Sequence, residues 1–282
     1  MTTKRCTAKG CREGGSLFRT RFRRRTPEGF DVGPNWYCSE SCVKEGLDSV
    51  IEELLSGRTR GISSERSLRP TLGLLLMEQG QLTKEELDHA LDVQRNEPGL
   101  RVGELLVRLG KVSEREVTQA LSRQFAVPWV NFVKGQMSDA VLRMIPPVVA
   151  RTYSAIPVDY QAAAGRLLIA IVGPPDYGFV HGLSRMLELD VAVLVADASR
   201  VNELVERFYP EEQAQERLIE LGAVGAPVLA DLIATQASRY KAKELRLERC
   251  GERLWLRLIR DDKRRDLLIA IDLPEVPEVR VS

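Results

Sequence analysis

Four cysteines near the start of the chain have the spacing of metal ligands. Cys6 and Cys11 form a C-x4-C pair, and Cys38 and Cys42 form a C-x3-C pair. A structural zinc ion needs four soft ligands at tetrahedral positions, and two cysteine pairs on tight turns supply them while closing a segment too small for its own core. We therefore predict that these four cysteines bind zinc. The alternative is a set of free or disulfide-linked thiols, and disulfides are uncommon in the cytoplasm.

The elements around these cysteines must hold the two pairs together. Apolar residues with helical spacing follow Cys42, which predicts a helix through Leu55 whose first turn carries the second pair. Residues 17–36, between the pairs, have the pattern of a hairpin. A helix N-terminus favours thiolates, because its free N–H groups carry partial positive charge. The layout resembles a treble-clef zinc finger, in which a knuckle, a hairpin and a helix surround one metal ion.

The expected hairpin is rich in arginine. Its basic residues alternate with Phe18 and Phe22, and they are Arg19, Arg21, Arg23, Arg24 and Arg25. Such a surface could bind phosphates and stack on bases. The same pattern is typical of an exposed strand, so we favour a solvated or protein-docking surface and keep a nucleic-acid interface as the alternative.

A second group of residues recurs later in the chain. Residues 71–94 align without a gap with residues 101–124. The shared types include Gly73 and Gly103, Leu75 and Leu105, Leu76 and Leu106, Gly80 and Gly110, and Gln94 and Gln124. A repeat of this kind is one small structure written twice, which cannot bury its apolar face alone. We expect the copies to pack as a pseudo-symmetric pair, and packing by itself would explain the repeat.

Each copy reads as a helical hairpin. The leucines at its start have helical spacing, and Gly80 and Gly110 are placed to end the first helix at a left-handed position. In the first copy, Thr83 and Glu86 form a capping box that starts the second helix, and the second copy repeats this box. The sequence therefore predicts four short helices between residues 71 and 124.

The composition of the whole chain narrows the classes of function. A chain of 282 residues allows about two or three domains, and 44% hydrophobic residues suffice for real cores. The net charge of +1 does not demand a nucleic-acid partner. The sequence has neither an apolar run long enough to span a bilayer nor a signal-peptide pattern, so we expect a cytoplasmic protein. His89 and His181 lie without a catalytic constellation.

The predicted fold is an α+β multidomain architecture. It combines a small zinc finger, an α-helical tandem-hairpin module, an α/β domain and a C-terminal α/β segment. We place the zinc finger at residues 1–57, a linker at 58–69, the helical module at 70–130, the α/β domain at 131–210 and the last segment at 211–282.

Strand patterns indicate where the sheets form. The α/β domain is expected to follow a strand-like run, VPWVNF (127–132), and a helix that Pro146 and Pro147 break. Its own strands are expected at 155–160, 166–172 and 190–196. In the last segment, a helix at 228–240 is expected to precede strands at 244–249, 253–260 and around 266–271.

From residue 69 to residue 210 the chain resembles the N-terminal region of type II secretion and type IV pilus assembly ATPases. The resemblance rests on the repeat pair, VPWVNF, LRMIPPVVARTYSAIPVDY, LLIAIVGPPD and SRVNELVERFYP, in the order of the family. The later run APVLADLIATQAS is similar to the helix that enters the family's catalytic region. No G-x4-G-K-[ST] phosphate loop occurs in the sequence. The resemblance therefore implies a stand-alone relative of the regulatory region rather than an enzyme.

In one subset of this family the helical module binds cyclic di-GMP, a two-fold symmetric dianion with two guanine bases. The family signature is an arginine, an apolar residue and a glycine, then two apolar residues, a second glycine and a terminal glutamine, present twice. By resemblance the first copy contributes Thr71, Leu72, Gly73, Leu75, Leu76, Gly80 and Gln94, and the second contributes Arg101, Val102, Gly103, Leu105, Leu106, Gly110 and Gln124.

The chemistry of such a site explains the residue types. An arginine can donate two hydrogen bonds to a guanine edge, a glycine lets the ligand approach the backbone, leucines cover the base and the glutamine bonds a phosphate or a base. The second copy has all of these residues. In the first copy Thr71 replaces the arginine and cannot make the bidentate contact, although Arg69 could substitute. The spacer at 95–100 is one residue longer than the family pattern, which would misalign the halves.

Three functions follow from these observations. We predict a non-catalytic regulatory or adaptor protein of a type II secretion or type IV pilus-like system that binds cyclic di-GMP. The alternatives are a purely protein-docking adaptor and a nucleic-acid-binding regulator led by the zinc finger. The expected partners are protein components of the machine rather than nucleic acid.

Overall fold

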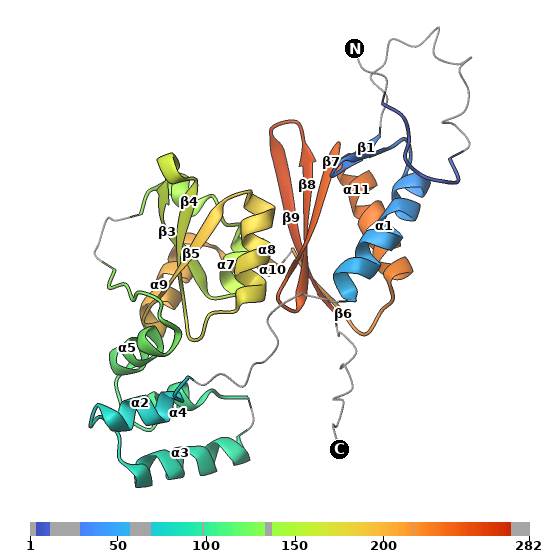
Figure 1. The fold of residues 1–282 in the computed structure, drawn as a ribbon. Helices are drawn as coiled ribbons and strands as arrows, with labels where there is room; N and C mark the ends of the chain where they lie inside the picture. The colour runs from blue at the N-terminus through green and yellow to red at the C-terminus, as the bar shows by residue number, and fades with distance from the viewer. Residues whose placement is uncertain are drawn as a thin grey trace, which may run out of the picture. The chain divides into compact units, whose positions relative to one another are not determined.

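The computed structural model describes residues 4–11, 29–56, 69–97, 99–132, 137–215 and 217–271 (Figure 1). The chain divides into two compact units. One unit combines residues 1–59 with residues 217–282, and the other consists of residues 60–216. The arginine-rich part of the expected hairpin and residues 58–68 of the expected linker lie outside the described residues. None of the described helices is long and apolar enough to cross a membrane.

The first unit contains a six-stranded sheet with the order β2-β1-β7-β8-β9-β6. Its strands are β1 (Phe30–Val32), β2 (Asn35–Tyr37), β6 (Leu218–Leu221), β7 (Glu244–Cys250), β8 (Arg253–Arg260) and β9 (Lys263–Ile271). The strands β7, β8 and β9 form an antiparallel meander, while β1 pairs parallel with β7 and β6 pairs parallel with β9. The segments at the two ends of the chain therefore share one sheet, which the sequence did not predict.

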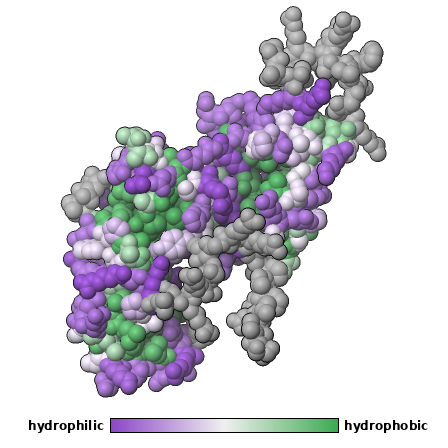
Figure 2. Space-filling model, in the orientation of Figure 1, coloured by the Kyte–Doolittle hydropathy of each residue, from purple (hydrophilic) through white to green (hydrophobic). Residues whose placement is uncertain are grey.

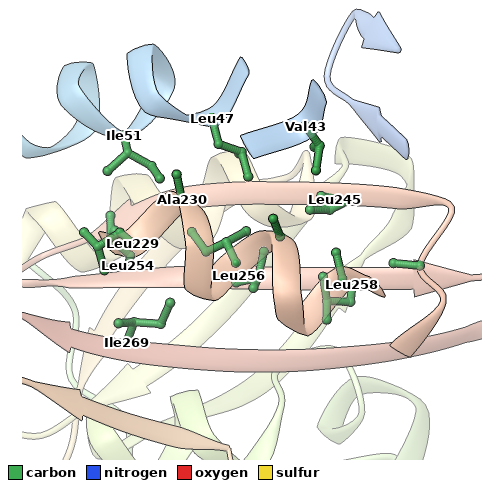
Figure 3. Packing of buried hydrophobic residues seen from close by; sticks show 14 of the residues in the cluster. Val43, Leu47, Ile51, Leu229, Ala230, Leu245, Leu254, Leu256, Leu258 and Ile269 are labelled. Atoms are coloured by element: carbon green, nitrogen blue, oxygen red, sulfur yellow. The ribbon is translucent and has the colours of Figure 1, made fainter. Parts of the chain in front are cut away.

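Two helices cover one face of this sheet, α1 (Glu40–Leu55) and α11 (Ala226–Tyr240) (Figure 3). Alternate residues of β8, Leu254, Leu256 and Leu258, point at the helices, because successive side chains of a strand face opposite sides. Leu47 and Ile51 of α1 lie fully buried in the same core. The helix that carries Cys42 is thus anchored by apolar packing that does not depend on the cysteines.

The second unit contains a three-stranded sheet with the order β3-β4-β5. It is built from β3 (Ala155–Gln161), β4 (Arg166–Ile171) and β5 (Asp190–Val195), with α6 (Asp139–Leu142), α7 (Pro147–Thr152), α8 (Tyr177–Leu187), α9 (Ala198–Phe208) and α10 (Glu211–Gln215). β3 and β4 are antiparallel, and α8 connects β4 to the parallel strand β5. The three strands predicted in this domain are confirmed.

Two details of this domain differ from the sequence prediction. The run VPWVNF was predicted to be strand-like, but it forms only an isolated bridge, between Trp129 and Val195 at the end of β5. Pro146 and Pro147 do more than break the preceding helix. Pro146 is the N-cap of α7 and Pro147 is its first residue, where a missing N–H and a fixed φ fit a helix start.

The helical module of this unit has the four predicted helices, α2 (Leu72–Glu78), α3 (Lys84–Asn96), α4 (Val102–Arg108) and α5 (Glu114–Phe125). Gly80 and Gly110 follow the first helix of each copy with φ of +69° and +67°, as predicted. Both capping boxes are present. The leucines of the two copies share one core, while Figure 2 shows polar residues along the rim of the module. The predicted packing of the copies against each other is confirmed.

Candidate functional site

The four N-terminal cysteines come together at one point. The sulfur atoms of Cys6, Cys11, Cys38 and Cys42 all lie within 4.8 Å of one another. The Sγ of Cys38 is 3.5 Å from that of Cys11 and 3.7 Å from that of Cys42. We call this group the thiol cluster. It contains all four predicted metal ligands, and their four sulfur atoms surround one point.

Local structure explains how the thiol cluster is positioned. Cys38 directly follows β2, and Ser39 is the N-cap of α1, where its hydroxyl accepts a hydrogen bond from the N–H of Cys42. Glu45, one turn further along α1, accepts from the N–H of Gly10 at 3.1 and 3.3 Å. The segment that carries Cys6 and Cys11 is therefore tied to α1 by its backbone as well as by the thiols.

The electrostatics of the thiol cluster are unfavourable for free thiolates. Burial and hydrogen bonds with the neighbouring thiols raise the pKa of Cys38. Four sulfur atoms this close cannot all ionise, because each thiolate disfavours the next. A bound divalent cation reverses this balance and holds coordinating thiols in the deprotonated form. The donor set, with four sulfurs and partial burial, therefore fits a zinc ion.

The repeated motifs meet at the starts of α2 and α4. Thr71 is the N-cap residue of α2 and Arg101 is the N-cap residue of α4. The side chain of Leu72 lies so close to Gly103 that a Cβ placed there would be 2.9 Å from Leu72 Cδ2. The structure thus brings together the two positions at which the family motif begins. We call this place the paired helix starts.

The two N-cap residues differ in what their side chains do. The hydroxyl of Thr71 accepts a hydrogen bond from the N–H of Leu74 at 3.5 Å. Arg101 makes no side-chain cap, and its exposed guanidinium has no hydrogen-bond or ion-pair partner among the described residues. It lies against Gly173, in the turn between β4 and α8. Thr71 therefore stabilises its own helix, whereas the guanidinium of Arg101 makes no hydrogen bond with the described residues and packs against Gly173.

The terminal glutamines cross between the copies. Gln94, from the first copy, donates through Nε2 to the carbonyl oxygen of Leu100 at 2.7 Å, directly before Arg101. Gln124, from the second copy, donates to the carbonyl oxygen of Pro70 at 2.9 Å, directly before Thr71. The start of α4 is therefore bonded by a glutamine of the first copy, and the start of α2 by a glutamine of the second copy. We call each helix start with its bonded glutamine a half-site. The sequence pattern grouped Arg101 with Gln124 of its own copy, whereas in the structure Gln94 contacts the residue before Arg101.

The longer spacer does not disturb this arrangement. The carbonyl oxygens of Leu100 and Pro70 occupy equivalent positions, one residue before each motif, and both are bonded by the equivalent glutamine. The expected misalignment of the halves is therefore not observed. The signal that the sequence reasoning overlooked is the pairing of a terminal glutamine with the start of the opposite copy.

Most apolar residues of the motif serve packing. Leu72, Leu75, Leu76, Leu105 and Leu106 are buried in the module core, and Val102 is half-buried against it. A Cβ at Gly73 would lie 2.7 Å from both terminal carbons of Leu87, and one at Gly103 would lie 3.0 Å from Val117 Cγ1. The sequence assigned these glycines to close ligand approach, whereas a residue of the second helix fills the space beside each.

Arg69, the residue considered as a substitute for the missing arginine, has another contact. Its guanidinium lies over the ring of Phe125, 5.4 Å from the centroid. Phe125 ends α5 and is next to Gln124. Arg69 therefore helps to hold the start of α2 against α5 through the contact of its planar group with Phe125.

Comparisons with known proteins give a family context. Residues 125–215 match the family model described as the MshEN domain, a range that begins at the end of α5 and covers the α/β part. The type IV pilus assembly ATPase PilB of Myxococcus xanthus is 28% identical over 141 residues, which are 50% of this chain and 24% of that protein. PilB of Thermus thermophilus is 30% identical over 140 residues, 50% of this chain and 16% of that protein. The chain thus spans about a quarter or less of the length of these relatives.

A solved structure of MshE with cdg is also similar to this chain. It is 27% identical, and the alignment covers 50% of this chain and 100% of that one with a TM-score of 0.44. The sequence identities and the family model all concern roughly half of the chain or less.

Proposed function

We propose that the chain is a non-catalytic regulatory protein of a type II secretion or type IV pilus machine. Residues 125–215 match the MshEN domain, and the chain is related, as the sequence predicted, to the N-terminal region of the assembly ATPases of such machines. It acts in the cytoplasm and binds cyclic di-GMP through its helical module. Its binding partners are protein components of the machine.

The observation that carries this proposal is the pair of helix starts. A symmetric dinucleotide needs two similar recognition surfaces a short distance apart, and the two copies of the motif supply them around the contact between Leu72 and Gly103. Each surface has an N-cap residue, Thr71 or Arg101, and a glutamine from the opposite copy. Equivalent residues of the two copies make these contacts, so the two surfaces resemble each other because the sequence repeats.

Arg101 is the main recognition residue of the proposed site. Its guanidinium, which has no hydrogen-bond partner among the described residues, can donate two parallel hydrogen bonds to the O6 and N7 atoms of a guanine. Such a bidentate contact contributes about 1–3 kcal/mol of discrimination. At Thr71 the hydroxyl is engaged with Leu74, so this half contributes less to the binding of a second guanine.

Isothermal titration calorimetry with cyclic di-GMP tests the proposal. We expect binding to the wild type and a loss of about ten- to a hundred-fold in affinity for Arg101→Ala, which corresponds to the lost bidentate contact. The matched control is Arg108→Ala at the other end of α4, where a surface ion pair with Glu97 contributes little. Absence of binding at millimolar cyclic di-GMP would reject the nucleotide-binding function.

A protein-docking adaptor is the second candidate. One observation favours it, the 52% exposure of Leu74, an apolar residue of α2 at a position where the second copy has Glu104. An exposed leucine beside a capped, threonine-containing half-site fits a surface that contacts protein instead of nucleotide. Binding of cyclic di-GMP that Arg101→Ala removes would count against this alternative.

We further infer that the thiol cluster binds a structural zinc ion. Cys6, Cys11, Cys38 and Cys42 would hold the ion, which would neutralise the thiolates and tie the segment of residues 4–11 to the start of α1. The support is the convergence of four sulfur atoms within 4.8 Å, since a bound cation allows all four to be thiolates at this distance.

Elemental analysis of the purified chain tests the metal site. We expect about one zinc per chain in the wild type and none in Cys38→Ser. Cys250→Ala is the matched control, because this buried cysteine lies on β7 outside the thiol cluster and its replacement should leave the zinc content unchanged. A folded wild type without zinc would contradict the assignment.

A further inference from the structure

We propose that the two half-sites read different bases and that the preferred ligand is a mixed cyclic dinucleotide with one guanine and one adenine. The proposal rests on the nucleotide binding proposed above and specifies its ligand. It starts from an inequality within a repeat that is otherwise well matched, since the two N-cap residues of the paired helix starts are Thr71 and Arg101.

The half-site at Arg101 favours guanine. The Arg101 guanidinium makes no cap and has no hydrogen-bond partner among the described residues. It packs against Gly173, which has no side chain, and its N–H groups are unbonded there and can donate to a ligand. Guanine presents two acceptors, O6 and N7, on its Hoogsteen edge, and adenine presents one acceptor and one donor. A donor-only guanidinium therefore selects guanine at this half-site.

The half-site at Thr71 lacks such a group. The Thr71 hydroxyl accepts from the N–H of Leu74, and the guanidinium of Arg69 stacks on Phe125. Neither residue offers two parallel donors to a base. The affinity for guanine is therefore lower at this half-site than at Arg101. The affinity for adenine is unaffected, because adenine has only one acceptor on this edge and makes no bidentate contact with a guanidinium.

Gln124 gives the Thr71 half-site a preference of its own. Its Nε2 is identified by the hydrogen bond to the Pro70 carbonyl oxygen, because only an N–H can donate to that acceptor. The side-chain oxygen Oε1 is then the atom left to accept a hydrogen bond from a bound base. An amide oxygen accepts from the N6 amine of adenine but opposes the O6 acceptor of guanine.

The same amide orientation occurs at Gln94 in the other half-site, where Nε2 donates to Leu100. There Arg101 adds the donors that guanine needs. The difference between the half-sites thus depends on one position of the repeat, the N-cap residue, which is Thr71 or Arg101. The two half-sites are adjacent because Leu72 packs against Gly103.

Calorimetric titration of the full chain with three ligands tests the proposal: cyclic di-GMP, 3′,3′-cyclic GMP-AMP and cyclic di-AMP. In the wild type we expect the mixed ligand to bind about ten-fold more tightly than either symmetric one, the lower part of the range for one base contact. Cyclic di-GMP binding that equals or exceeds that of the mixed ligand would overturn this inference and leave the proposed function standing. Failure of all three ligands to bind would reject the proposed function itself.

Two substitutions sharpen the test. Thr71→Arg makes the halves alike, and we expect cyclic di-GMP to become the tightest ligand. Arg101→Thr makes them alike in the opposite sense, so cyclic di-AMP should then bind at least as tightly as the mixed ligand. Both variants place a residue that already occurs at the equivalent N-cap, and circular dichroism would verify the fold. An unchanged ranking in folded Thr71→Arg would overturn the assignment of the bases.

Discussion

The crossed glutamines lead to a prediction about which residues cooperate. Gln94 holds the carbonyl group directly before Arg101, whereas Gln124 holds the carbonyl group directly before Thr71. Replacing Gln94 by alanine should therefore loosen the backbone that aims Arg101. Replacing Gln124 should loosen the other half-site and leave Arg101 in place.

The size of the effect follows from the bond that is lost. A side-chain hydrogen bond to a half-exposed carbonyl contributes about 0.5–1.5 kcal/mol net, which is about two- to thirteen-fold in affinity when the bond orders a ligand contact. Gln94→Ala should weaken cyclic dinucleotide binding by this factor in the wild type and by little in Arg101→Ala. The coupling between Gln94 and Arg101 should thus be about 1 kcal/mol, while Gln124→Ala and Arg101→Ala should be additive within about 0.5 kcal/mol.

Calorimetry on the single and double variants measures both couplings in one double-mutant cycle each. Thermal unfolding by circular dichroism verifies that every variant retains its helices. A stronger coupling of Arg101 to Gln124 than to Gln94 would refute the crossed arrangement and restore the grouping of residues by hairpin. Equal couplings would show that the glutamines do not distinguish the half-sites.

Two further predictions concern the stability of the helical module. Gly73→Val should destabilise it by about 1–3 kcal/mol in denaturant titration, because its Cβ would lie 2.7 Å from the terminal carbons of Leu87, and an unaffected midpoint would contradict the close packing. Hydrogen bonds from the capping-box backbone lower the pKa of Glu86 and Glu116, so their stabilisation is present above the unfolded pKa of about 4.3 and is lost as the pH falls through the lower folded pKa. Thermal melts between about pH 2 and 6, the range of carboxyl titration, should show a fall in melting temperature as the pH is lowered. The double variant Glu86→Gln/Glu116→Gln should show a smaller fall.

Local sequence chemistry determined much of the structure. The capping boxes, the left-handed glycines Gly80 and Gly110 and the alternating leucines of β8 each depend on a few neighbouring residues, so their helices, turns and strands could be predicted. The convergence of the four N-terminal cysteines could also be predicted from their spacing, and the structure brings them together. The resemblance to pilus and secretion ATPases came from motif order and agrees with the MshEN match.

Other features were decided by contacts between distant segments. β1 pairs with β7, more than two hundred residues later in the chain, and nothing in either short strand specifies that partner. The packing also assigned Gly73 and Gly103 to contacts with neighbouring helices, which glycine patterns alone do not distinguish from ligand contacts.

The sequence by itself determined that the motif occurs twice and that the first copy has Thr71 in place of an arginine. Only the tertiary structure decided which glutamine lies at which helix start. It places Gln94 beside Arg101 and Gln124 beside Thr71. The physical reason is that neither hairpin can bury its leucines alone, so the copies pack against each other and the end of each copy meets the start of the other.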